Sequence, residues 1–108
     1  MAALKKLILT LDANGSEVGG PTVPTFVMSN LLAASVAESI AVPAGAKFVL
    51  FSATGDFYAK YDGTATVPGD STDGTSSELN PVTRDISGVT TISIISAATP
   101  IVTMAFYS

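Results

Sequence analysis

The stretch AKFVLFSATGDFYAKYD, residues 46–62, decides the fold class of this chain. Its first run, residues 46–53, is rich in aromatic and β-branched side chains, which favour β-strands. Its second run, FYAKYD, places Phe57, Ala59 and Tyr61 two residues apart, so these side chains share one face of an extended strand. The turn sequence TGD separates the two runs. The stretch therefore predicts two strands that pair as a β-hairpin.

Further strands are expected on both sides of this stretch. Residues 91–96 (TISIIS) and 101–107 (IVTMAFY) have the same character, and residues 97–100 are expected to link them as a tight turn. Residues 37–42 and 84–86 predict two more short strands. Alternation places side chains on shared faces, namely Ile92 with Ile94, and Val102 with Met104 and Phe106. Short strands at this spacing predict an all-β fold, a single antiparallel β-sandwich or a jelly-roll-like barrel.

Two segments between the strands have a different composition. Residues 63–81 are rich in Gly, Pro, Ser, Thr and Asp and predict a long central loop with a short strand at residues 65–67. Residues 31–38 (LLAASVAE) have helix propensity and could form two helical turns.

The N-terminal region predicts a separate element. Glycine- and proline-rich residues 12–24 lie between two apolar, strand-capable runs. We therefore expect residues 1–35 to form an extended N-terminal arm or a first hairpin. Residues 36–108 are expected to form the β-sandwich core, within one domain overall.

The chain contains little charge. Of its 108 residues, 13% are charged and 47% are hydrophobic, whereas an average soluble domain has about 25% charged residues. Two explanations stay open: partners cover part of the surface, or Ser and Thr supply its polarity. The five basic residues are scattered, apart from the Lys5–Lys6 pair, and the net charge is −4. This argues against direct nucleic-acid binding, because phosphates require a basic patch.

The chain contains no cysteine and no histidine. Disulfides, thiolate metal sites and cysteine nucleophiles are therefore excluded, and the commonest general base is missing. The glycine-rich segments match neither the P-loop nor the dinucleotide-binding pattern. We therefore expect no enzymatic activity and no cofactor.

Acidic residues gather in the middle of the chain: Asp56, Asp62, Asp70, Asp73, Glu78 and Asp85. Such residues could hold calcium or act as an acid pair on a glycoside. The segment DSTDG fails as an EF-hand, because aligning Gly74 with the invariant glycine puts Gly69 first and Asn80 last. We interpret these residues as solvated loop acids.

No segment predicts secretion or membrane insertion. The apolar run at residues 7–9 is much shorter than the core of a signal peptide. No run approaches the roughly 18 apolar residues that a membrane span requires. We therefore expect a protein that is not exported by a signal peptide and does not bind membranes.

Three sequence phrases resemble those of a known group of proteins. They are VPAGAKFVLFSATGDFYAKYDG at residues 42–63, SELNP at residues 77–81 and ISGVTTISIISAATPIVTMAFY at residues 86–107. They resemble small virion-associated β-sandwich proteins of tailed bacteriophages and prophages, over residues 38–107. The resemblance implies a structural part of a phage particle, located in the virion after assembly in the host cytoplasm.

Capsid decoration is the function that we expect from this resemblance. A decoration or cement protein is small and non-enzymatic, and it stabilises the head by binding the major capsid protein or another virion protein. We expect a homo-oligomer whose contact residues include four in the N-terminal region: Leu7, Leu9, Val23 and Phe26.

Two alternatives stay open. The chain could be a tail, baseplate or head-fibre component that binds a host glycan or another tail protein through the loop at residues 63–81. It could also be a small enzyme or calcium-dependent binder built on the mid-chain acids.

Overall fold

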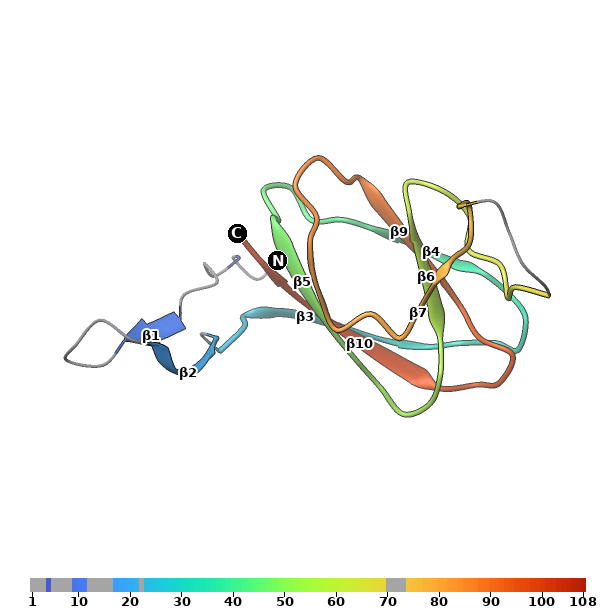
Figure 1. Ribbon diagram of the computed structural model, residues 1–108, viewed down its shortest axis with the longest axis horizontal. Coiled ribbons are helices and arrows are strands. Elements are labelled where there is room, and N and C mark those ends of the chain that lie inside the picture. Colours follow the sequence, from blue (N-terminus) through green and yellow to red (C-terminus); the bar gives the residue numbers. More distant parts are fainter. Residues whose placement is uncertain (1–3, 5–8, 12–16, 22, 70–73) are drawn as a thin grey trace.

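The computed structural model of the chain describes residues 4, 9–11, 17–21, 23–69 and 74–108. Within these residues every regular element is a β-strand. Two four-stranded antiparallel sheets form the body of the molecule, and a separate two-stranded sheet lies beside them (Figure 1). The prediction of an all-β, antiparallel sandwich is confirmed.

The strands of each sheet come from distant parts of the chain. The first sheet has the order β3 (Phe26–Leu31), β10 (Ile101–Tyr107), β5 (Phe48–Ala53) and β8 (Thr83–Asp85). The second sheet has the order β4 (Glu38–Ala41), β9 (Thr91–Ile95), β6 (Tyr58–Tyr61) and β7 (Glu78–Leu79). The two-stranded sheet pairs β1 (Leu9–Leu11) with β2 (Glu17–Pro21).

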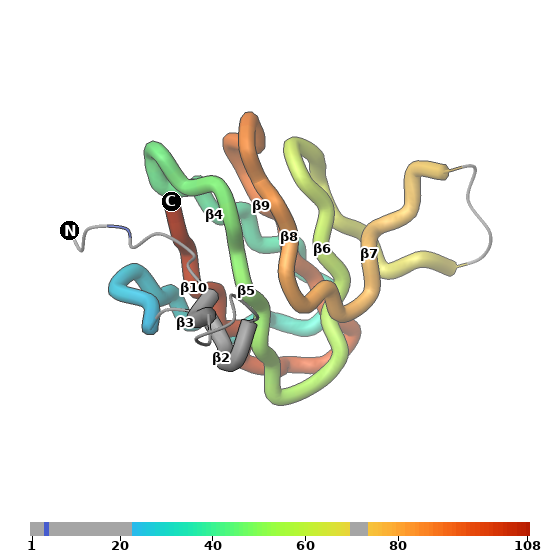
Figure 2. The backbone as a smooth tube through the Cα atoms, turned by 60° about the vertical axis from the view of Figure 1, so that its left-hand side comes forward, coloured from blue at the N-terminus to red at the C-terminus, as the bar shows by residue number. Residues whose placement is uncertain are grey.

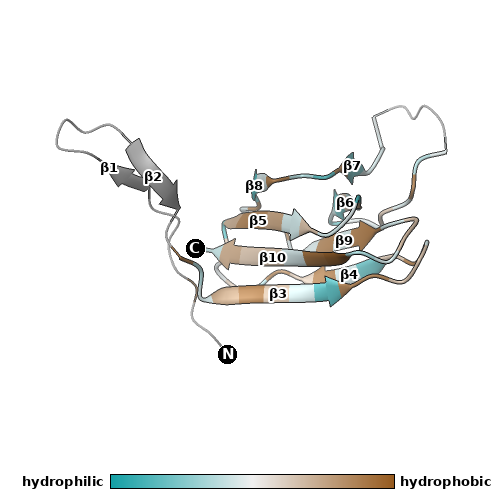
Figure 3. Ribbon diagram, turned by 90° about the horizontal axis from the view of Figure 1, so that it is seen from below, coloured by the Kyte–Doolittle hydropathy of each residue, from teal (hydrophilic) through white to brown (hydrophobic). Residues whose placement is uncertain are grey.

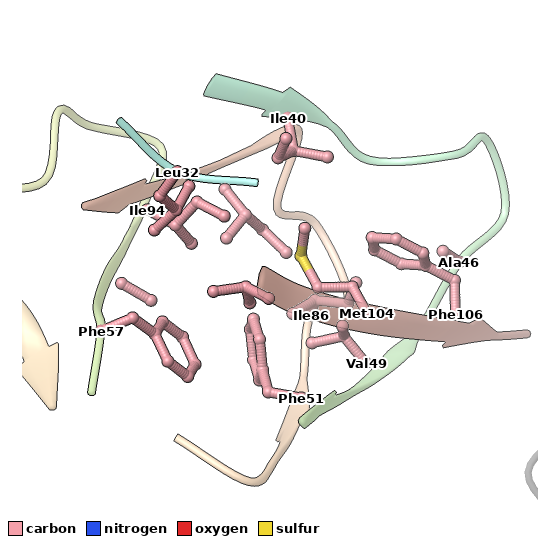
Figure 4. Packing of buried hydrophobic residues seen from close by; sticks show 13 residues of the cluster. Leu32, Ile40, Ala46, Val49, Phe51, Phe57, Ile86, Ile94, Met104 and Phe106 are labelled. Atoms are coloured by element: carbon pink, nitrogen blue, oxygen red, sulfur yellow. The ribbon is translucent and has the colours of Figure 1, made fainter. Parts of the chain in front are cut away.

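The hydrophobic core lies between the two four-stranded sheets. The predicted alternation is confirmed, because Val102, Met104 and Phe106 of β10 are fully buried, as are Ile92 and Ile94 of β9. Figure 4 shows side chains of both sheets meeting in this layer. Burial of apolar area at about 25 cal/mol per Å² is the main force that holds the sheets together.

The predicted hairpin at residues 46–62 is wrong. Both strands form, but β5 pairs with β10 and β8, whereas β6 pairs with β9 and β7. Each strand has an apolar face that needs a partner across the core. With β5 and β6 in opposite sheets, the rings of Phe51 and Phe57 contact each other with centroids 5.7 Å apart. The turn at residues 54–57 therefore crosses from one sheet to the other.

The connection at residues 97–100 makes the same kind of crossing. It joins β9 of the second sheet to β10 of the first, so it does not close a hairpin. Among the connections from β3 onward, only the one from β6 to β7 stays within a sheet. Long-range pairing therefore builds this fold.

The helical turns predicted at residues 31–38 are absent. Leu32 is buried in the core, and Ser35 has a positive φ of 58° and donates its backbone N–H to Ser96 O at 2.7 Å. The segment is instead the connection from β3 to β4. Tertiary contacts outweigh its helix propensity.

The short strand predicted at residues 65–67 is also wrong, and the central loop contains β7 instead. Ala65 is buried and donates its N–H to the hydroxyl oxygen of Ser93 at 2.9 Å. This contact places the loop on the outer side of the second sheet. Figure 2 shows that the described ends of the loop extend beyond β7.

β3 belongs to the sandwich, although the sequence analysis placed its residues in the N-terminal region. The reason is its regular pairing with β10, from Phe26 with Phe106 to Leu31 with Ile101. This pairing joins two segments that lie far apart in the sequence. The part of the N-terminal region outside the sandwich is the β1–β2 hairpin. These two strands contact only each other among the strands, and they project to one side (Figure 1).

Candidate interaction surface

On three of the four strands of the first sheet, β3, β10 and β5, the outer side carries no charge, whereas β8 places Asp85 beside Phe48 on this side. Three of the cross-strand rows there are Val27–Ala105–Leu50, Ser29–Thr103–Ser52 and Leu31–Ile101. We call these eight residues the outer face. Interfaces between proteins are depleted of charge at their centres. The outer face therefore has the composition of a protein-binding surface.

The outer face is accessible at the β3 side. The exposed fractions are 50% for Val27, 68% for Leu31 and 43% for Ile101. Leu50 and Ala105 are half-buried among their neighbours. Exposed apolar residues that stand singly are common on proteins, but a contiguous group of them indicates a binding site.

The two sheets differ in what lies on their outer sides. On the second sheet, Ser93 of the central strand β9 is buried, because the loop after β6 passes over it and Ala65 contacts its hydroxyl group. Thr66 N donates to Ser77 Oγ at 3.0 Å and Lys60 Nζ donates to Thr75 O at 3.1 Å, which holds the loop in place. The central loop thus covers the second sheet at Ser93, whereas no described segment covers Val27, Leu31 and Ile101 on the outer face of the first sheet.

β3 is one edge of the first sheet, and its pairing within the described part of the chain is with β10 alone. Leu32 N donates to Pro100 O at 3.0 Å, and these residues continue the β3–β10 register. Antiparallel pairs alternate between hydrogen-bonded and non-hydrogen-bonded positions. Even-numbered β3 residues therefore bond to β10, and the backbone groups of Val27, Ser29 and Leu31 point toward the open edge. Figure 3 shows β3 at this edge, beside β10.

The opposite edge of the sandwich is closed by a polar cluster. The Arg84 guanidinium on β8 contacts the Glu78 carboxylate on β7 through Nη2 to Oε2 at 2.7 Å and through Nε to both oxygens at 3.0 Å. Tyr61 OH donates to Glu78 Oε1 at 2.9 Å. The hydrogen bonds from Arg84 lower the pKa of Glu78, while burial and the hydrogen bond to Glu78 raise the pKa of Tyr61. The cluster links the edge strands of the two sheets.

The other described acids of the mid-chain group hold turns. Asp62 accepts hydrogen bonds from Thr90 and Thr91, Asp85 accepts one from Ser87 N, and Asp56 accepts one from Asn80 Nδ2. These bonds from Thr90 and from Ser87 lower the pKa values of Asp62 and Asp85. Asp70 and Asp73 lie outside the described residues.

No metal-binding group was found in the described part of the chain, where no three His, Cys, Asp or Glu residues come together. Two shallow depressions lie between loops. One is lined by residues 42–47 and 87–90 and the other by residues 51–57 and 80–82. Each contains a single charged residue, Lys47 in the first and Asp56 in the second. Neither depression therefore brings an acid and a base together.

The four predicted contact residues have different positions. Leu7 lies outside the described residues, and Leu9 is in β1. Val23 is 78% exposed, just before β3. Phe26 is half-buried and packs edge-on against Phe106 with ring centroids 5.9 Å apart, so its ring faces the core.

The sequence analysis missed Val27, Leu31 and Ile101. A signal for the first two was present, because residues 18–37 contain no charged residue. Ile101 needs the register with Leu31, which only the structure provides.

Searches against protein-family models, curated proteins and solved structures found no match for this chain. In the part of the chain that the structure describes, no helix has the length and apolarity to cross a membrane.

Proposed function

We propose that this chain is a non-catalytic structural protein of a bacteriophage particle, and that it decorates the capsid. The observation that carries the proposal is the uncharged outer face of the first sheet. The sequence resemblance to virion-associated β-sandwich proteins is the reason to expect a phage particle as the partner. The outer face is the surface that could bind it.

The physical argument concerns what a decoration protein must do. It binds a fixed protein surface in many copies and needs no catalytic group, so a rigid sandwich with one apolar side suits the task. Apolar contact from Leu50, Val27 and Leu31 would drive binding through burial. If several copies act together, modest contacts by each give a lasting attachment.

The β1–β2 hairpin offers a second point of contact. It precedes β3 directly and projects from the sandwich (Figure 1). An extended segment of this kind can add strands to a neighbouring sheet. In this proposal the hairpin, with Leu9 and the exposed Val23 beside it, grips the neighbouring virion protein.

The test is co-sedimentation with empty particles assembled from the major capsid protein of the genome that encodes the chain. Leu50→Lys places a charge on the outer face at a half-buried position of β5. The matched control is Ser39→Lys, an exposed position on β4 of the second sheet. We expect the wild type and Ser39→Lys to bind particles in many copies, and Leu50→Lys to bind at least about tenfold more weakly.

Melting temperatures of both variants establish that they are folded. Undiminished binding by a folded Leu50→Lys would remove the outer face from the proposal. A wild-type chain that does not bind heads and instead purifies with tails would contradict the decoration role. This result would favour the tail or fibre role, with the loop at residues 63–81 as the recognition element. Point variants are preferred to an N-terminal truncation, because Leu4 packs against the core.

A further inference from the structure

The four edge strands of the sandwich differ in how they are protected from pairing with another chain. Proteins protect edge strands by making them short, charged or covered. β8 has three residues and contains Arg84 and Asp85, β7 has two residues and contains Glu78, and β4 contains Glu38. β3 has six residues, no charge and a regular register with β10. Among the described residues, β3 alone of these four strands has none of the usual protections.

We propose that β3 pairs with β3 of a second copy of this chain, antiparallel and about a two-fold axis at Ser29. The two first sheets then join into one continuous sheet. This inference goes beyond the phage role and does not depend on it, because it concerns the isolated protein.

The register of this pairing follows from the open edge. The backbone groups of Val27, Ser29 and Leu31 point toward it, so only odd-numbered residues can form the hydrogen-bonded pairs with the second copy. A two-fold axis at Ser29 places Val27 opposite Leu31 of the second copy, and Leu31 opposite Val27 of the second copy. A shift by two residues would place either Val27 or Leu31 opposite Ser29, depending on its direction, and would lose this apolar match.

Side chains support the same arrangement. Val27 and Leu31 are 50% and 68% exposed, and in this register each would gain an apolar neighbour on the outer side of the joined sheet. Within the described residues, the buried side-chain nitrogen of Asn30 has no hydrogen-bond acceptor. The register brings the Asn30 residues of the two copies to diagonal positions, so the seam lies beside this unpaired donor.

Charge favours a second copy over a charged partner. The chain has a net charge of −4, but residues 18–37 contain no charged residue, so two copies can meet at β3 without like charges at the seam. A basic or acidic peptide would find no opposite charge there. Each copy has one such edge, so the two-fold pairing closes on itself and does not extend into fibres.

The size of the contact predicts its strength. A pair of six-residue strands buries less than the roughly 1,200 Å² at which stable interfaces begin. We therefore expect a concentration-dependent dimer with a Kd of about 1 μM or weaker.

The experiment is sedimentation velocity of the full chain over a concentration series, with three variants. Ser29→Lys places two like charges directly opposite each other at the two-fold axis. Ser29→Glu does the same with the opposite sign. Ser52→Lys is the matched control, because both serines are exposed and lie beside Thr103 in the register, Ser29 on β3 and Ser52 on the interior strand β5.

We expect the wild type and Ser52→Lys to dimerise with Kd values within about twofold of each other. Ser29→Lys and Ser29→Glu should each dimerise at least about tenfold more weakly, and their equimolar mixture should recover dimers, because opposite charges then face each other. Circular dichroism establishes that each variant is folded.

Three results would overturn the proposal. They are a wild type that stays monomeric up to about 1 mM, a folded Ser29→Lys that dimerises like the wild type, and a Ser52→Lys that loses dimers to the same degree. The last result would assign the contact to the outer face instead of the edge. The two proposals can fail separately. A wild type that dimerises but does not bind capsids would contradict only the proposed function.

Discussion

Asp62 joins the end of β6 to the start of β9 through one carboxylate oxygen. Its Oδ1 accepts hydrogen bonds from Thr90 N at 2.9 Å, Thr90 Oγ1 at 2.8 Å and Thr91 N at 3.1 Å. The residue has a positive φ of 54°, which Asp and Asn tolerate better than most residues. These hydrogen bonds hold the pKa of Asp62 below its ordinary value of 3.8. The folded state therefore binds fewer protons at this group than the unfolded chain.

This difference predicts a pH dependence for Asp62→Asn. A lowered folded pKa contributes stability above the unfolded value, and this contribution is lost as pH falls through the folded value. Asn keeps the oxygen acceptor and the left-handed backbone but removes the charge. We expect the variant to melt below the wild type at pH 7, with a gap that narrows below about pH 4. Thermal melts across this range measure it, and a gap that is the same at pH 3 and pH 7 would contradict the assignment.

Several of the turns that connect strands are fixed by hydrogen bonds to distant parts of the chain. Ser35, Asp62 and Asn80 have positive φ angles, and each donates its backbone N–H to a distant segment, at Ser96 O, Thr91 O and Phe57 O respectively. The turn before β5 uses glycine instead. Gly45 has a φ of +83°, and Ala46 N donates to Pro43 O at 3.1 Å, which is the geometry of a turn that needs glycine at its third residue.

Gly45→Ala is therefore expected to destabilise the chain through its backbone alone. A Cβ at this position would meet nothing within 4 Å, so the cost is the left-handed conformation, about 1 kcal/mol. Gly69→Ala is the control, since a Cβ there also meets nothing and φ is not in the left-handed region. Urea unfolding of both variants gives the comparison. Equal midpoints for Gly45→Ala and the wild type would show that the turn relaxes without cost.

On the scale of the whole molecule, the two long edges of the sandwich have opposite character. The β7–β8 edge is closed by the Glu78–Arg84 pair, which links the two sheets, whereas β3 leaves its edge open. The exposed fractions of the two charged side chains are 43% for Arg84 and 37% for Glu78. Solvent therefore screens the pair, and its contribution to stability is modest despite the short distances.

A double-mutant cycle of Glu78→Gln and Arg84→Met measures this contribution. We expect a coupling free energy of about 0.5–1 kcal/mol at low salt, smaller at about 1 M salt. Urea unfolding of the four proteins at both salt concentrations provides the data. Coupling that is zero within error at low salt would show that the ion pair does not stabilise this edge.

The amino-acid sequence by itself determined the fold class, most strand positions and which side chains enter the core. These properties depend on alternation within single strands, such as Val102, Met104 and Phe106, and alternation is local. Helix propensity is also local, and it gave the wrong prediction for residues 31–38. There the burial of Leu32 in the core outweighs the preference for a helix.

Only the tertiary structure decided which strands pair. A short turn such as residues 54–57 can close a hairpin or cross between sheets, and the choice depends on what lies on the other side of the core. The open edge of β3 and the outer face have the same origin, since they require the register between residues 26–31 and 101–106. Pairing over such separations is decided by the packing of all strands together, which no single stretch of sequence contains.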